Sequence, residues 1–145
     1  MKMKAKDITK NLTNLIPLAE KHMPVDVMLA IVDNIEVLKE KTETIEEMRK
    51  KIVDRYVLKD ENGNAMTVKT ETGERYDIPD SKVTAFEAEY AELLESELEV
   101  QITMIGVKRL EKMDTDYGTY DSLTGVDLMT LRFMLIRYRR PTDAA

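Results

Sequence analysis

The residues that could do chemistry are few, and their spacing matches no catalytic pattern. His22 is the single histidine and the chain has no cysteine, so the side chains that usually bind zinc and other transition metals are nearly absent. We therefore predict no metal site and no cofactor, and we expect His22, beside Pro24, to cap a helix end. Ser96 and Ser122 lie in no strand–turn–helix context that would present a nucleophile. Ser-His-Asp catalysis is therefore not predicted.

Two acidic, glycine-containing loops resemble ion sites only superficially. "DTDYGTYD" contains Asp114, Asp116 and Asp121, but a calcium loop needs a different spacing and a distal bidentate glutamate. In "KDENGN" the glycine comes too early. Both loops are predicted to be plain turns, because Asp, Asn and Gly are the residues that turns use. An enzyme that holds a divalent ion in residues 114–121 remains an alternative, but the prediction is that the protein is not an enzyme.

The strongest feature is an acidic stretch, residues 86–105 ("FEAEYAELLESELEVQITMI"). It carries six glutamates and no lysine, arginine or histidine. In one interpretation its carboxylates stay unpaired and bind a basic partner, because complementary charge steers association. The partner-binding residues that we predict on this basis are Glu87, Glu92, Glu95 and Glu99.

The alternative interpretation is a solvated helix face that the rest of the protein neutralises. Bases of the long helix that precedes the acidic stretch would then cross the interface to these glutamates. The residues predicted for this role are Lys39, Lys50 and Lys51.

Length and composition limit the class of protein. The 145 residues fit one domain, residues 1–145, and 43% hydrophobic with 34% charged residues is typical of a helix-rich globular chain. A net charge of -6 argues against direct nucleic-acid binding, which needs clustered Lys and Arg. No apolar run approaches the length that crosses a bilayer, and "MKMKAKDITK" lacks the apolar core of a secretory signal. We therefore expect no membrane partner and a cytoplasmic protein.

Hydrophobic periodicity predicts the elements of the amino-terminal half. Residues 1–6 alternate as a short strand does, and a helix capped by Asp7 follows and breaks at Pro17. The next helix is predicted over residues 24–56, with a second, half-polar row beside its apolar row. The apolar row recurs every seven residues: Ile31, Leu38, Ile45 and Ile52.

The second half is predicted to cover that long helix. A hairpin over residues 65–78 turns near Gly73, with Met66 and Val68 facing Tyr76 and Ile78. A third helix begins at residues 80–81 and continues its apolar spacing to residue 98, followed by a strand over residues 100–104 that pairs with residues 1–6. Thr124 and Asp127 indicate a capping box before a last helix, in which residues 128, 131 and 135 face inward, with residues 133 and 134 as further candidates.

The fold class that follows is α+β, mostly α. It combines a long antiparallel helical hairpin with a small β-hairpin at its tip and short strands at its base. Because the two helices are joined through a compact connection, we expect their apolar rows to pack against each other along their length.

The chain also resembles a family of small proteins from phages and prophages of Gram-positive bacteria. The segments that carry the resemblance are "YVLKDENGNA", "TETGERYDIPD", "EYAELLESELEVQI" and "GVDLMTLRFML". The resemblance spans most of the chain, but its motifs are architectural and supply no active-site residue. It implies a phage origin and a location in the cytoplasm of the bacterial host or in the virion.

Two functions of different classes are therefore expected. The first is a phage-encoded, non-enzymatic protein-interaction module that modulates or inhibits a host or phage protein through its acidic face. The alternative is a structural or assembly component of the virion, which would form a homo-oligomer through exposed apolar positions.

Overall fold

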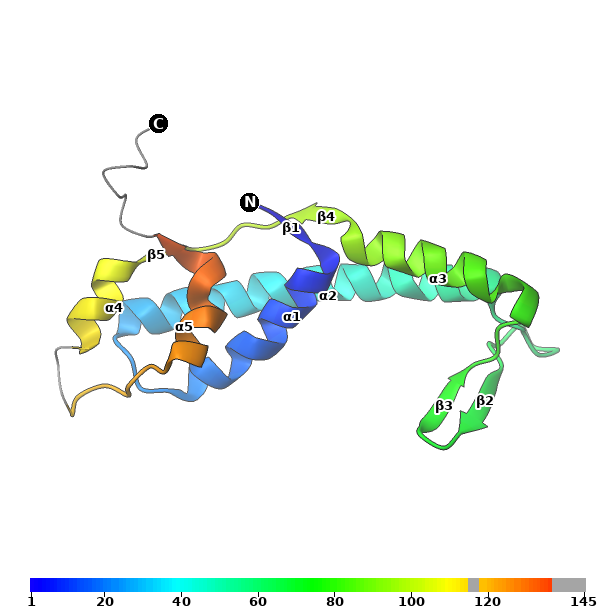
Figure 1. Ribbon diagram of the computed structural model, residues 1–145, viewed down its shortest axis with the longest axis horizontal. Helices are drawn as coiled ribbons and strands as arrows, with labels where there is room; N and C mark the ends of the chain where they lie inside the picture. Colours follow the sequence, from blue (N-terminus) through cyan, green and yellow to red (C-terminus); the bar gives the residue numbers. More distant parts are fainter. Residues whose placement is uncertain (115–117, 137–145) are drawn as a thin grey trace.

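The computed structural model describes residues 1–114 and 118–136, apart from the side chain of Asp114. Over these residues the protein is mostly helical, with three small pairs of strands (Figure 1). The α+β, mostly α class is therefore confirmed. The described helices are α1 (Ala5–Leu15), the 3-10 helix η1 (Ile16–Glu20), α2 (Val25–Tyr56), α3 (Asp80–Glu95), α4 (Val107–Asp114), α5 (Gly125–Leu131) and the 3-10 helix η2 (Arg132–Met134).

Each of the three sheets has two short strands. Strand β1 (Lys2–Lys4) pairs antiparallel with β4 (Glu97–Glu99), and β2 (Thr67–Thr70) pairs antiparallel with β3 (Gly73–Tyr76). The third pair is parallel and joins two segments that are distant in sequence. It consists of β5 (Ile105–Gly106) and β6 (Leu135–Ile136).

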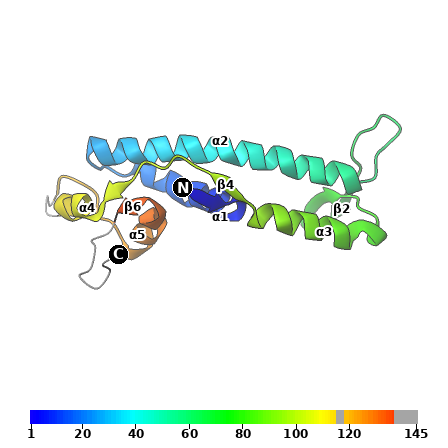
Figure 2. The ribbon, with the colours of Figure 1, turned by 90° about the horizontal axis from the view of Figure 1, so that it is seen from above.

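The long helix α2 is the element on which the others pack. Its predicted bounds agree with the structure to within one residue, and Ile31, Leu38 and Ile45 are buried as the seven-residue spacing predicts. Helix α1 lies along the middle of α2, whereas α3 runs antiparallel to its carboxy-terminal half (Figures 1 and 2). The predicted helical hairpin is therefore visible only for that half.

Aromatic and aliphatic contacts join α3 to the end of α2. The rings of Tyr56 and Phe86 meet edge to face with their centroids 6.2 Å apart, and Phe86 stacks on Tyr90 at 6.1 Å. Leu93 is buried at the other end of the same interface. These contacts hold α3 on α2 and leave the β2–β3 hairpin projecting from the far end of the pair (Figure 1).

The end of α3 differs from the prediction. The helix stops at Glu95, and the strand that pairs with β1 is β4 rather than residues 100–104. The Ser96 carbonyl accepts a hydrogen bond from the Ala5 amide at 2.9 Å, so the chain leaves the helix in order to pair with the amino-terminal segment. In the resulting ladder Lys2 stands opposite Glu99 and Lys4 opposite Glu97, an arrangement that favours pairing.

The hairpin at the tip forms as predicted, with its turn before Gly73, but its register is different. Val68 stands opposite Arg75, and Tyr76 stands opposite Thr67. The two-residue turn at positions 71–72 fixes these partners. Gly73 has φ 127°, a conformation that residues with a side chain rarely adopt.

The termini of two other helices can be compared with the sequence. Helix α1 begins at Ala5, so Asp7 lies within its first turn rather than at its cap, and Pro17 lies in η1, where the helix was predicted to break. The capping box of Thr124 and Asp127 is confirmed. The last helix is shorter than expected, because α5 ends at Leu131 and η2 begins at Arg132.

Burial along this last segment also departs in part from the prediction. Leu131 is fully buried and Leu135 is half-buried, but Leu128 is 44% exposed. Helix α4 was not anticipated at all. Within residues 1–114 and 118–136, the helices are either too short or too polar to traverse a lipid bilayer.

Candidate functional site

Glu95, at the end of α3, is held by two lysines from the amino-terminal segment. Its carboxylate accepts a hydrogen bond from Lys4 Nζ at 2.7 Å and another from Lys6 Nζ. These two bonds lower the pKa of Glu95 to about 2. The carboxylate therefore ties β1 and α1 to the end of α3, although all three side chains remain partly exposed.

Glu99 lies in strand β4 and not on a helix. Its Oε1 accepts a hydrogen bond from the amino group of Met1 at 2.9 Å. This contact lowers the pKa of Glu99 below its ordinary value. Like Glu95, Glu99 has its charge balanced at the base of the fold.

Glu92 is exposed and lines a shallow groove between α2 and α3. The same groove contains Lys51 and Arg55, and Arg55 forms an ion pair with Glu89 at 3.3 Å. Positive and negative side chains are therefore mixed here, so Glu92 is part of a surface of balanced charge.

Glu87 lies elsewhere, near the start of α3, where the helix meets the hairpin. It lines a cavity of about 350 Å³ that we call the tip groove. The lining residues are Val68, Arg75, Tyr76, Asp77, Ile78, Asp80, Val83, Phe86 and Glu87.

The four predicted glutamates consequently do not form one surface. Glu87 and Glu92 are five residues apart, which places them about 140° apart around a helix of 3.6 residues per turn. Glu95 and Glu99 are ion-paired at the base of the fold. Within the described part of the chain, the predicted cations of the long helix make no ion pair with these glutamates; these cations are Lys39, Lys50 and Lys51.

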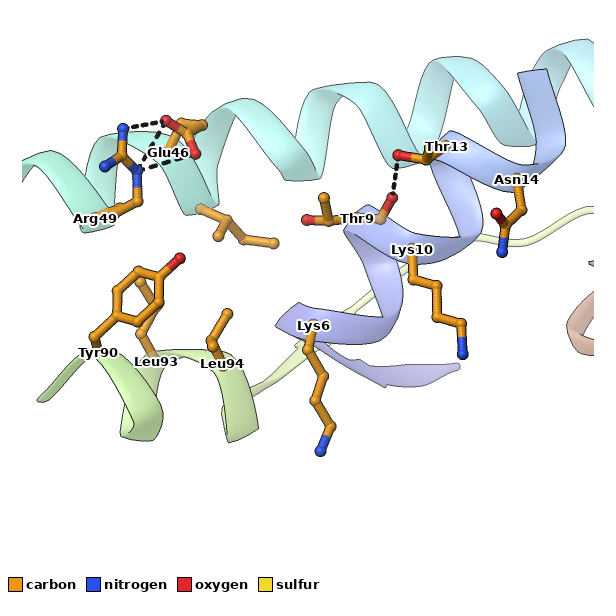
Figure 3. Close-up of a pocket in the computed structure, with 11 residues that line it drawn as sticks. Lys6, Thr9, Lys10, Thr13, Asn14, Glu46, Arg49, Tyr90, Leu93 and Leu94 are labelled. Atoms are coloured by element: carbon orange, nitrogen blue, oxygen red, sulfur yellow. Dashed lines mark hydrogen bonds and ion pairs between the residues drawn. The ribbon is translucent and has the colours of Figure 1, made fainter. Parts of the chain in front are cut away.

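A third groove, of about 400 Å³, lies where α1, α2 and α3 meet (Figure 3). Its aliphatic wall includes Leu93 and Leu94, and Tyr90 points into it. Arg49 donates bidentate hydrogen bonds to Glu46 at 3.0–3.1 Å, which lower the pKa of Glu46. Glu46 supplies the one carboxylate drawn in Figure 3, and it is held by this arginine.

His22 and Asp121 are used to dock a loop. The His22 amide donates a hydrogen bond to Asp121 Oδ2 at 2.6 Å, and the Asp121 amide donates to the His22 carbonyl at 2.9 Å. The imidazole packs against the ring of Tyr120, with centroids 5.4 Å apart. Asp116 lies outside the described residues, as does the side chain of Asp114.

The other acidic loop, at residues 59–64, is closed by its own aspartate. Asp60 Oδ1 accepts hydrogen bonds from the Asn62 and Asn64 amides, both at 2.9 Å, which is the geometry of a turn. Among residues 1–114 and 118–136 there is no group of three histidine or acidic side chains placed to hold a metal ion.

Comparisons with known proteins support no assignment to a family: no protein-family model matches the sequence, and no curated protein or solved structure matches it significantly.

The feature that the sequence interpretation missed is the exposure of the hairpin. All eight residues of β2 and β3 are exposed, including Val68 and Tyr76 at 37% each. A signal was present in the sequence, because "TVKT" and "GERY" place polar or charged residues on both faces of the hairpin. A hairpin of that composition has no face that must be buried.

Proposed function

We propose that the protein is a non-enzymatic protein-interaction module that binds its partner with the hairpin tip. The observation that supports this most directly is the exposed apolar surface of the tip. Met66 is 41% exposed, and Val68 and Tyr76 follow closely. Exposed apolar side chains on a projecting element are typical of a contact surface, because covering them removes apolar area from water.

The acidic residues divide between this surface and the body of the protein. Glu87 lines the tip groove and is assigned to partner binding. Glu92 is exposed at the α2–α3 groove, where Lys51 and Arg55 balance the acidic charge, and it is not assigned to partner binding. Glu95 and Glu99 are assigned to fold stability, because their charges are already paired.

The resemblance to phage and prophage proteins supports a phage origin. In this proposal the partner is a host or phage protein, and the module acts in the cytoplasm of the bacterial host or in the virion. Binding modulates or inhibits the partner by occupying its surface. No chemistry is required of the module itself.

The test is capture of proteins from a bacterial lysate by the immobilised chain. The double variant Val68→Asp/Glu87→Lys should lose the captured protein, whereas Glu20→Lys, a charge reversal on η1, should retain it. Both variants should keep the circular dichroism melting temperature of the wild type, since the substituted side chains are exposed. Equal capture by all three proteins would overturn the assignment to the tip.

A second function, self-association in the virion, is favoured by a different observation. Val25, Leu29 and Val32 are 72%, 56% and 41% exposed, and their spacing of four and three places them on one face of α2. Two copies could bury this outer row against each other. A defined oligomer in light scattering that Leu29→Glu dissociates would support this role, and a monomer at all concentrations would remove it.

A further inference from the structure

The tip groove is lined by apolar residues, which we call its floor, and by charged residues, which we call its rim. The apolar lining residues come from the hairpin, from the segment that follows it, and from the first turns of α3. These residues are Val68, Tyr76, Ile78, Val83 and Phe86. At about 350 Å³ the groove can accept a large aliphatic or aromatic side chain.

The rim carries three carboxylates and one guanidinium. Asp77, Asp80 and Glu87 lie around the floor together with Arg75, which leaves a local charge of two negative units. Within the described part of the chain, these three carboxylates make no ion pair and no side-chain hydrogen bond. A cationic group of a partner would therefore be attracted to these carboxylates, because no lysine or arginine of the described residues already pairs with them.

The hairpin beside the groove also has backbone groups without partners. Apart from the pairing of β2 with β3, residues 67–70 and 73–76 make no backbone–backbone hydrogen bond within the described residues. Open strand edges of this kind pair with extended peptides. The geometry thus suits a segment that runs along the hairpin and places alternate side chains toward the groove.

From these three features we infer that the tip groove binds an extended peptide segment of a partner protein in which a large apolar side chain stands two residues from an arginine or lysine. The apolar side chain occupies the floor, and the basic side chain reaches the carboxylates of Asp77, Asp80 and Glu87. This inference rests on the proposed function and specifies the chemistry of the partner. An acidic segment would meet repulsion at the same rim.

The test is a selection from a random-peptide library displayed against the immobilised, full-length chain. The expected result is enrichment of peptides with an apolar residue two positions from Arg or Lys. A synthetic peptide of the enriched sequence should bind Glu87→Lys about tenfold more weakly than the wild type. It should bind Glu20→Lys as it binds the wild type, and its binding to the wild type should weaken at high salt.

Three outcomes would overturn the inference: no enrichment, an enriched acidic sequence, or peptides that bind Val68→Asp/Glu87→Lys as tightly as the wild type. The proposed function would survive these outcomes if the same double variant still lost its captured protein in the lysate experiment. Conversely, the double variant could capture protein as the wild type does while the library is enriched in peptides that combine an apolar and a basic residue. The inferred peptide specificity would then stand, and the proposed function would be overturned.

Discussion

The side-chain amide of Asn34, fully buried in α2, hydrogen-bonds both backbone groups of Thr103. Asn34 Nδ2 donates to the Thr103 carbonyl at 2.9 Å, and the Thr103 amide donates to Asn34 Oδ1 at 2.7 Å. The Asn34 side chain thus satisfies the backbone groups of Thr103 in the way that a neighbouring strand would. Thr103 lies in the segment between β4 and β5. The contact fixes that segment to α2 and lets Val100 enter the core.

Replacing this residue should destabilise the fold. Asn34→Ala removes both bonds and leaves the backbone groups of Thr103 without partners, so the free energy of unfolding should fall by about 1–3 kcal/mol. Urea denaturation measures the change. Asn62→Ala, in the exposed turn, should change stability by less than about 0.5 kcal/mol. Equal effects of the two substitutions would contradict the role assigned to Asn34.

Two leucines of α2 test which face of the helix is covered. Leu38 is fully buried, whereas Leu29 is 56% exposed. Leu38→Ala should lower the free energy of unfolding by about 2–5 kcal/mol, because it removes buried methyl groups and leaves a cavity. Leu29→Ala should lower it by less than about 0.5 kcal/mol. A large loss at Leu29 in a monomeric sample would show that another element covers the outer row.

The Glu95 ion pairs should contribute to stability only above a certain pH. The pKa of Glu95 falls from 4.5 to about 2 because Lys4 and Lys6 donate hydrogen bonds to its carboxylate. A carboxyl whose pKa is lower in the folded state stabilises the fold above its unfolded pKa, and this contribution is lost as the pH falls toward about 2. Wild type should therefore have a higher urea midpoint than Glu95→Gln at pH 7, and the difference should vanish near pH 2.

Salt and a matched variant control this measurement. Because the pairs are exposed, the difference at pH 7 should shrink in 1 M salt, an ionic strength at which the screening length is about 3 Å. Glu47→Gln alters a glutamate that makes no ion pair among the described residues and should show little pH-dependent difference. A Glu95→Gln midpoint equal to that of wild type at pH 7 would contradict the stabilising role of the Glu95 ion pairs.

The sequence predicted α2 well because a long amphipathic helix repeats its signal many times. It could not show that two different elements share the buried row. Helix α3 has 16 residues and α2 has 32, so α3 alone could cover only half of it. The buried Asn34 was missed for a related reason, since a polar residue on the buried face of a helix gives no indication in the sequence of its long-range partner.

The end of α3 shows how local spacing can mislead. Leu98 continues the three- and four-residue spacing from Leu94, and neither Gly nor Pro lies between them. The helix ends because Ser96 and the residues after it pair with the amino-terminal segment, about 90 residues away. A contact of that kind leaves no local pattern in the sequence.

The candidate site was anticipated only in part. Six acids in residues 86–105 were visible in the sequence, but the cations that pair with Glu95 come from the amino-terminal segment rather than from the long helix. These partners of Glu95 were not predicted because they are distant from it in the sequence. Glu87 was selected for its charge, and only the fold shows that it shares a groove with the exposed side chains of the hairpin.

Photo-crosslinking tests most directly the claim that the hairpin tip is the recognition surface. Benzoylphenylalanine at position 76 places the reactive group on the exposed hairpin, at a residue that lines the tip groove, and the same residue at position 29 places it on the outer row of α2. In the bacterial lysate used for the capture experiment, substitution at position 76 should give an adduct with a different protein, and substitution at position 29 should give none. An adduct between two copies of this chain from position 29, with none from position 76, would contradict the account and favour self-association.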